Sequence, residues 1–248
     1  MTALQSHIRR AAAAGRTTEQ VGPFLATFSP RSANPFLNYA VPDDGARPTP
    51  ADVAALTDAY QRRDLLPRLE FLAATAPGAE AVLLAAGYEV ERRIPVMLCP
   101  PGALRRPPPP PGIELVVPES DVDFEGMITA QHEAFGDPGP VDVVGARDAA
   151  AHGGVRVYAR DARTGEPVGG GAAEPVVDGT TEIAGIAVRA PYRRRGAGAA
   201  ITAWLTAAVH EQGAHTVFLT PAGTDEQRLY ARVGYQATDD MLHLRLSG

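Results

Sequence analysis

Apolar residues change from strand spacing to helix spacing on either side of one short glycine-bearing stretch. Residues 181–188 (TEIAGIAV) form an apolar run bounded by turn residues, which predicts a strand. Beyond residue 198 the apolar positions recur at helical spacing as far as Gly213, a residue typical of a helix end: Ile201, Trp204, Leu205, Ala208 and Val209. Between them lies the basic stretch 193–198 (RRRGAG). The sequence therefore predicts a strand, a basic glycine loop and a helix in succession.

The same patterns predict the other elements of residues 112–248. A helix over residues 121–134 begins with either Ser120 or Asp121 as its cap, and Asp178-Gly179 indicates a hairpin. Strands are expected over 112–118, 154–159, 167–177, 216–220 and 241–246, and further helices over 141–152 and 225–232. A helix separates the strands 181–188 and 216–220, so these two should be parallel. We expect an α/β (α+β) fold, a mixed sheet with a central parallel strand pair and helices on both faces.

A proline-rich segment divides the chain. Residues 100–112 (PPGALRRPPPPPG) favour an extended, semi-rigid spacer. This predicts an N-terminal unit of residues 1–99, a linker of residues 100–111 and a second domain of residues 112–248.

Composition narrows the class of protein. Of 248 residues, 45% are hydrophobic and 21% charged, as in ordinary globular proteins, and the net charge of −6 disfavours nucleic acid as a partner. The single cysteine, Cys99, excludes an internal disulfide framework. No apolar run reaches the roughly 20 residues of a membrane helix, and no signal peptide is recognisable, so we expect a cytoplasmic protein without membrane contact.

The glycine loop has the chemistry of a phosphate site. Gly196 and Gly198 allow a tight backbone, and the following helix start offers free N–H groups to an anion. The spacing is neither that of a Rossmann loop nor that of a Walker loop, and the chain contains no lysine. A solvated turn before an ordinary helix is the alternative for this stretch taken alone.

The stretch RRRGAG, the strand before it and the later LYARVGY together resemble the GNAT acetyltransferases over about residue 112 to the C-terminus. The resemblance implies that the loop holds the pyrophosphate of acetyl-coenzyme A and that the preceding strand contributes backbone groups. It gives the cofactor-binding set Ile186, Ala187, Val188, Arg193, Arg194, Arg195, Gly196, Ala197 and Gly198.

Two residues match positions of catalytic groups in that family. Tyr230 matches a tyrosine near the sulfur that acts as general acid, and the alternative is a half-buried helix tyrosine. Glu182 matches a strand glutamate used as general base, and the alternatives are water as the base or an exposed glutamate paired with an arginine. Gly185 is compatible with a bulge or with a close ligand, and the alternative is a position where another side chain packs over the strand. His132, Glu133 and Phe135 lie where the family lines its acceptor site, and no histidine spacing indicates a metal.

The N-terminal residues resemble a second, truncated GNAT unit. Gly87-Tyr88 and Gly234-Tyr235 are 147 positions apart (234 − 87), and the same offset joins Phe71-Leu72 to Phe218-Leu219, Ala40-Val41 to Ala187-Val188, and Thr17, Glu19, Val21 and Gly22 to Thr164, Glu166, Val168 and Gly169. Residues 46–51 (ARPTPA) fall opposite the glycine loop, where Pro48 and Pro50 have no N–H to offer. The prediction is a tandem protein whose first copy is degenerate and structural.

The expected function is transfer of an acetyl group from acetyl-coenzyme A to a primary amine of a small, cationic molecule, without a metal. The alternatives are a non-catalytic acyl-coenzyme A sensor or scaffold, and an enzyme that acetylates proteins or peptides. The oligomeric state, including a homodimer, is left open by the sequence.

Overall fold

The computed structural model describes residues 3–137 and 139–247 of the chain. These fall into two compact units, each described here by itself. The N-terminal unit contains Met1–Val96 and Thr238–Gly248, and the C-terminal unit contains Met97–Ala237.

The C-terminal unit is built on a mixed sheet. Its strands follow the order β5-β10-β9-β8-β7-β6, of which β5 contributes its last two residues. β9 and β10 are parallel, and the other pairs with recorded registers are antiparallel. The elements of this unit are β6 (Ile113–Val116), α4 (Asp121–Phe135), α5 (Val143–Ala151), β7 (Val155–Asp161), β8 (Pro167–Ala173), β9 (Thr180–Val188), α6 (Ala197–Glu211), β10 (Thr216–Leu219) and α7 (Thr224–Val233). The predicted fold class, with its parallel pair, is confirmed.

Local sequence signals explain where these elements begin and turn. Ser120, rather than Asp121, caps α4, and it forms a reciprocal capping box with Asp123. The hairpin before β9 turns at Asp178 and Gly179, whose φ angles of 51° and 70° are the left-handed values that such a turn needs.

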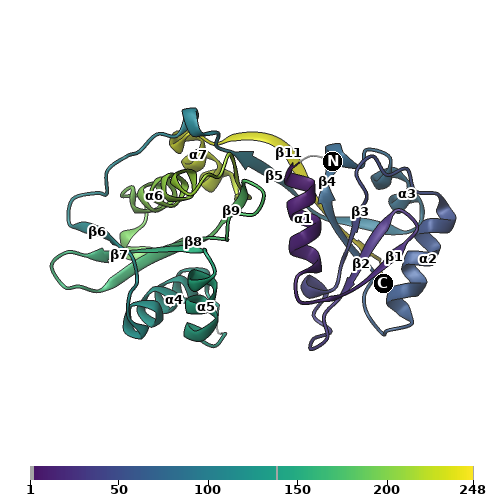
Figure 1. The fold of residues 1–248 in the computed structure, drawn as a ribbon, viewed down its shortest axis with the longest axis horizontal. Coiled ribbons are helices and arrows are strands. Elements are labelled where there is room, and N and C mark those ends of the chain that lie inside the picture. The colour runs from purple at the N-terminus through teal and green to yellow at the C-terminus, as the bar shows by residue number, and fades with distance from the viewer. Residues whose placement is uncertain (1–2, 138, 248) are drawn as a thin grey trace. The chain divides into compact units, whose positions relative to one another are not determined.

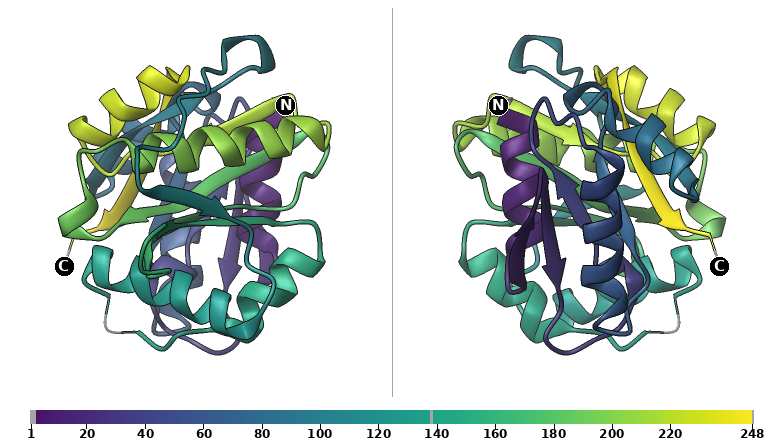
Figure 2. Two further views of the ribbon diagram at one scale, coloured as in Figure 1. Left: turned by 90° about the vertical axis from the view of Figure 1, so that its left-hand side faces the viewer. Right: turned by 90° about the vertical axis from the view of Figure 1, so that its right-hand side faces the viewer.

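Helices cover both faces of this sheet. α6 lies on one face of β7, β8 and β9, and α4 lies on the opposite face with α5 beside it (Figures 1 and 2). Both helices come very close to β8 because it carries glycines. A Cβ at Gly170 would lie 2.7 Å from Met127 of α4, and one at Gly171 would lie 2.9 Å from Ile201 of α6. The core between the sheet and α6 includes Val157, Ile183, Ile201, Leu205 and Val217.

The N-terminal unit is also built on strands of a sheet, and β5 contributes its residues up to Val96. The order is β1-β2-β3-β4-β11-β5, with β3 and β4 parallel. Helices α1 and α2 lie on opposite sides of these strands (Figure 2, right). The elements are α1 (Ala3–Ala13), β1 (Thr17–Val21), β2 (Phe24–Phe28), β3 (Ala40–Pro42), α2 (Pro50–Gln61), β4 (Arg68–Leu72), α3 (Ala79–Ala85), β5 (Tyr88–Leu98) and β11 (Gln236–Leu246).

The two last strands of the expected domains are exchanged. The sequence assigned residues 241–246 to the second domain, but β11 pairs with β4 of the N-terminal unit, with His243 opposite Glu70. Conversely, Leu98 and Met97 at the end of β5 pair with Phe218 and Leu219 of β10. β4, the last strand but one in the first half of the sequence, therefore pairs with β11, which ends the second half. β10, the last strand but one in the second half, pairs with β5, which ends the first half.

The expected boundaries 1–99, 100–111 and 112–248 accordingly differ from the compact units. Residues that follow Val96 are apolar and complete the C-terminal core, where Met97 and Cys99 are 2% and 0% exposed. The beginning of the proline-rich segment also belongs to that unit: Leu104 packs on the core, and the Arg105 N–H donates to the Val233 carbonyl over 2.8 Å.

We expect Leu244→Ala to destabilise the N-terminal unit by about 2–5 kcal/mol, because Leu244 is fully buried in β11 and alanine would leave a cavity. Denaturant unfolding followed by circular dichroism measures this loss. Arg245→Ala, at a half-exposed ion pair with Glu89, is the control and should cost at most about 1 kcal/mol. Equal stability of Leu244→Ala and wild type would contradict the burial of Leu244 in the core of this unit.

Candidate active site

The predicted basic loop forms the start of α6. Gly196 is the N-cap residue with φ 104°, a left-handed value that favours glycine, and no side chain among the described residues caps the helix. The first N–H groups of an α-helix have no partner within the helix, and they carry the positive end of its dipole. Arg194 and Arg195 beside them are exposed. The combination gives a site that attracts phosphate.

The three arginines have different surroundings. Arg193 donates from Nε to the Val188 carbonyl over 2.8 Å and from Nη2 to the Ala134 carbonyl over 2.6 Å, so its side chain joins β9 to the end of α4. Arg194 has φ 60°, a strained value for a residue with a Cβ. The Arg195 guanidinium lies 5.7 Å from the centre of the Tyr192 ring. Arg194 and Arg195 therefore remain for an anion, whereas Arg193 shapes the loop.

β9 separates from its parallel neighbour before it reaches this loop. The pairing with β10 ends at Glu182 and Phe218, while β9 continues to Val188. The backbone of Ile186, Ala187 and Val188 thus lies beyond the paired part of β10. A Cβ at Gly169 would lie 2.4 Å from the Ala187 carbonyl oxygen, so only a glycine allows β8 to follow β9 this closely.

β9 also contains the bulge for which Gly185 was a candidate. Its register against β8 shifts between Gly170, opposite Ala187, and Ala172, opposite Ala184. Three steps along β9 therefore match two along β8, and Gly185 takes φ 64° at the extra position.

Tyr230 lies on α7, which packs against the start of α6. Leu229, its neighbour in sequence, lies 3.3 Å from the position of a Cβ at Gly198. Tyr230 is 7% exposed, and burial, with a smaller effect from the charge of Glu226, raises its pKa to about 12. Its ring centre lies 6.1 Å from that of Tyr235, whose hydroxyl is 2.7 Å from Thr206 Oγ1. The phenol is therefore held in place and remains protonated at neutral pH.

Glu182 occupies the last position of β9 that pairs with β10. Side chains alternate along a strand, and Ile183 belongs to the core beneath α6, so Glu182 projects from the α4 face of the sheet. It is partly buried there. This is the sheet face across which α4 contacts β8 and β9.

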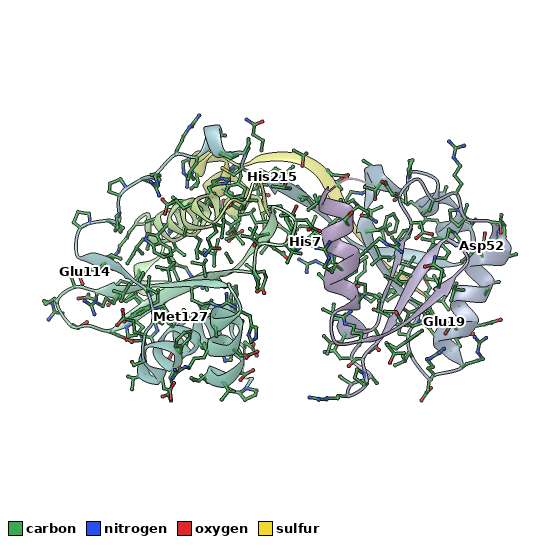
Figure 3. All side chains as sticks on the ribbon, in the orientation of Figure 1. His7, Glu19, Asp52, Glu114, Met127 and His215 are labelled. Carbon is green, nitrogen blue, oxygen red and sulfur yellow. The ribbon has the colours of Figure 1, made fainter. Side chains whose placement is uncertain are left out.

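His132 and Glu133, expected to line the acceptor site, lie on a different face of α4. With Thr129, Gly136 and Asp137 they border an open hollow of about 400 Å³. At 3.6 residues per turn, His132 and Glu133 are turned by more than about 100° from Met127, which packs on the sheet (Figure 3). Glu133 pairs with Arg189 at 2.8 Å, and Phe135 is largely exposed. Through Glu133, the border of this hollow is joined to Arg189, the residue that follows β9, and the acceptor role of His132, Glu133 and Phe135 stays a prediction.

The residue that the sequence did not reveal is Gln131. Its Nε2 donates to the Gly185 carbonyl over 2.6 Å, and it stands on the α4 face that carries Met127. The glycine run 169–171 is a signal of close packing over β8, but it does not say which helix residue approaches.

The described residues contain neither a metal-binding cluster nor a membrane-spanning helix. Residues 3–137 and 139–247 contain no group of three or more His, Cys, Asp or Glu side chains that could hold a metal. Within the same ranges, every helix is too short or too polar for a membrane span.

Comparisons with known proteins agree with this geometry. The sequence model of the acetyltransferase (GNAT) family matches residues 124–235. No curated protein matches the chain in sequence. A solved structure of a GCN5-related N-acetyltransferase from Kribbella flavida is 28% identical, with a TM-score of 0.84 over 99% of this chain and 95% of that chain.

Two further solved structures share the fold. A GCN5-related N-acetyltransferase from Sphaerobacter thermophilus is 19% identical, with a TM-score of 0.71 over 90% of this chain and 76% of its own. A tandem GNAT protein from the clavulanic acid biosynthesis pathway is 13% identical, with a TM-score of 0.67 over 97% and 88% of the two chains.

The strand, the loop and the helix therefore lie in a domain of the acetyltransferase class of enzymes. Residues 124–235 are a GNAT acetyltransferase domain, and the resemblance drawn from RRRGAG is confirmed.

Proposed function

We propose that the protein transfers an acetyl group from acetyl-coenzyme A to a primary amine of a small molecule. The observation that carries the proposal is the uncapped start of α6, with its exposed arginines, at the end of a strand that has left its parallel neighbour. The loop fits a pyrophosphate, and the open backbone of β9 fits the extended arm of coenzyme A.

At the phosphates, the coenzyme would be held by Arg194, Arg195, Gly196, Ala197 and Gly198, in a loop that the Arg193 side chain supports through the Val188 and Ala134 carbonyls. Along its arm, the backbone of Ile186, Ala187 and Val188 would hold it. When bound, acetyl-coenzyme A supplies an activated acyl group and a thiol as leaving group.

The residues of the chain supply the proton transfers. Glu182, directly or through water, accepts a proton from the incoming amine, and a β9 backbone N–H polarises the thioester carbonyl. Tyr230 donates its proton to the departing sulfur. Burial raises the pKa of Tyr230 to about 12, and it would also raise the basicity of a sulfur that leaves into the same region, which narrows the pKa difference between the two groups.

Direct attack is favoured over a covalent acyl-enzyme. Cys99 is the single cysteine, and it is fully buried in the C-terminal core. Burial raises its pKa to about 11, so almost none of it is thiolate at neutral pH. A thiol in this state is a poor nucleophile.

We infer one coenzyme site per chain, because the corresponding helix start in the N-terminal unit is closed. The residues equivalent by the offset of 147 to Gly196 and Ala199 are Thr49 and Asp52, which form a capping box at the start of α2 (Figure 3). Hydrogen bonds from Thr49 hold the pKa of Asp52 below its usual value, so a carboxylate occupies this helix start.

Element order supports a degenerate first copy. Helix, strand, helix and strand follow one another as α2, β4, α3 and β5, and again as α6, β10, α7 and β11. Their starts lie close to the offset of 147 found in the sequence. The N-terminal unit is then a repeat of the catalytic unit that has a structural role only.

The test is a thiol-release assay with acetyl-coenzyme A and a panel of amines, combined with calorimetry. Turnover of small cationic amines is expected, since a chain of net charge −6 offers little to an anionic acceptor. One equivalent of coenzyme A should bind per chain. Binding without turnover of any amine or peptide would favour a sensor, turnover of peptides alone would favour a protein acetyltransferase, and two equivalents would disprove the closed first copy.

A further inference from the structure

Gln131 contacts the one irregular point of the strand that approaches the coenzyme loop. Its side-chain amide donates to the carbonyl oxygen of Gly185 over 2.6 Å, and Gly185 is the bulged residue of β9. The two residues are 54 positions apart in sequence, so this contact exists only in the folded C-terminal unit.

Glycines in β8 and β9 allow Gln131 to come close to the sheet. A Cβ at Gly170 would lie 2.7 Å from Met127 and 3.5 Å from Gln131, so α4 reaches the sheet only because residue 170 is a glycine. A Cβ at Gly185 would lie 3.0 Å from the Gln131 amide nitrogen. The absence of side chains at Gly170 and Gly185 thus leaves the space in which the Gln131 amide reaches the Gly185 carbonyl.

The hydrogen bond fixes more than the carbonyl that it reaches. A trans peptide unit is planar, and its C=O and N–H point in opposite directions. An anchored Gly185 carbonyl therefore also fixes the direction of the Ile186 N–H. That N–H belongs to the part of β9 that extends beyond its pairing with β10.

We propose that Gln131 is a positioning residue, which holds the β9 bulge so that the backbone of residues 185–188 is oriented for the thioester. This inference rests on the proposed acetyl transfer. Gln131 takes no part in proton transfer and acts through the Gly185 peptide.

The sharpest substitution is Gln131→Glu, which keeps the size of the side chain but replaces the NH2 donor with a carboxylate that only accepts. Gln131→Ala removes the contact altogether. Glu125→Ala is the matched control, because Glu125 is exposed on the same helix. Each variant is examined in the full chain for kcat, for the affinity of acetyl-coenzyme A and for hydrogen exchange at the Ile186 amide.

Both Gln131 variants should lower kcat about tenfold, as expected for one lost hydrogen bond at a positioned group, and change coenzyme affinity less than threefold. Exchange at Ile186 should become about tenfold faster in both, while Glu125→Ala resembles wild type. Unchanged exchange would overturn the proposal, and so would faster exchange with normal kcat. If wild type acetylates nothing, the proposed function fails, while the exchange measurement still decides whether Gln131 holds the bulge.

Discussion

Tyr230→Phe is expected to lower kcat about 10²-fold and to leave the affinity for acetyl-coenzyme A nearly unchanged. Phenylalanine keeps the ring that packs against Tyr235 and removes only the hydroxyl proton. General acids contribute about 10²–10⁴-fold to a rate, and we expect the lower end because burial makes this phenol a weak acid. Among the described residues its hydroxyl has no hydrogen-bond partner, so its loss should cost little stability. Single-turnover kinetics measures the chemical step directly.

Tyr235→Phe is the matched control for this prediction. It removes the hydroxyl of the adjacent tyrosine, which is fully buried and bonded to Thr206. This variant should lose about 1 kcal/mol of stability and retain most of its kcat. A Tyr230→Phe enzyme with a normal single-turnover rate would remove Tyr230 from the acid role.

Local signals predicted the centre of the C-terminal unit well. The strand, the loop and α6 follow from apolar spacing and from Gly196, because helix starts and tight turns depend on a few neighbouring residues. The hairpin at Asp178-Gly179 was predictable for the same reason, whereas the bulge at Gly185 was one of several alternatives that the sequence left open. The predicted positions of Tyr230 and Glu182 came from the resemblance, and their roles stay predictions.

The strand exchange could not be predicted from such signals. A helix and a Gly-Tyr pair lead into β5 and again into β11: Gly87-Tyr88 follows α3, and Gly234-Tyr235 follows α7. Each of the two strands offers apolar residues to an antiparallel neighbour. Because the two halves resemble each other, β4 and β10 are equally suitable partners for either strand. Only tertiary packing, such as the burial of Cys99 with Val217, selects the exchanged arrangement.

Side-chain hydrogen bonds between distant parts of the C-terminal unit could not be predicted from the sequence for a related reason. The sequence indicated that Arg193 would bind phosphate, but its guanidinium reaches the carbonyls of Val188 and Ala134. Likewise, nothing in the vicinity of Gln131 points to Gly185. Side-chain bonds to a distant backbone depend on how helices pack on the sheet, and hydrophobic periodicity does not specify that.

Ala199→Asp is expected to weaken coenzyme A binding about 10²-fold. Ala199 is the third residue of α6, the position that Asp52 occupies in α2, so this change copies the closed helix start of the N-terminal unit into the catalytic one. A carboxylate about 5 Å from a phosphate charge, at an effective dielectric constant of about 20, costs roughly 3 kcal/mol, which corresponds to about 10²-fold in affinity. Titration calorimetry measures the affinity, and the loss should shrink at high salt because exposed charges are screened.

Ala199→Asn separates the charge from the added volume, which matters because Ala199 is partly buried against the core. Asparagine adds a side chain of nearly the same size that remains neutral, so it should weaken binding only about threefold. Its melting temperature should lie within a few degrees of that of Ala199→Asp, with the aspartate slightly favoured by the helix dipole. If the aspartate variant bound coenzyme A as tightly as the asparagine variant, the phosphates would not lie at the start of α6. The uncapped helix would then have to be explained without a ligand, and the contrast with the capping box of Thr49 and Asp52 would no longer distinguish a working copy from a structural one.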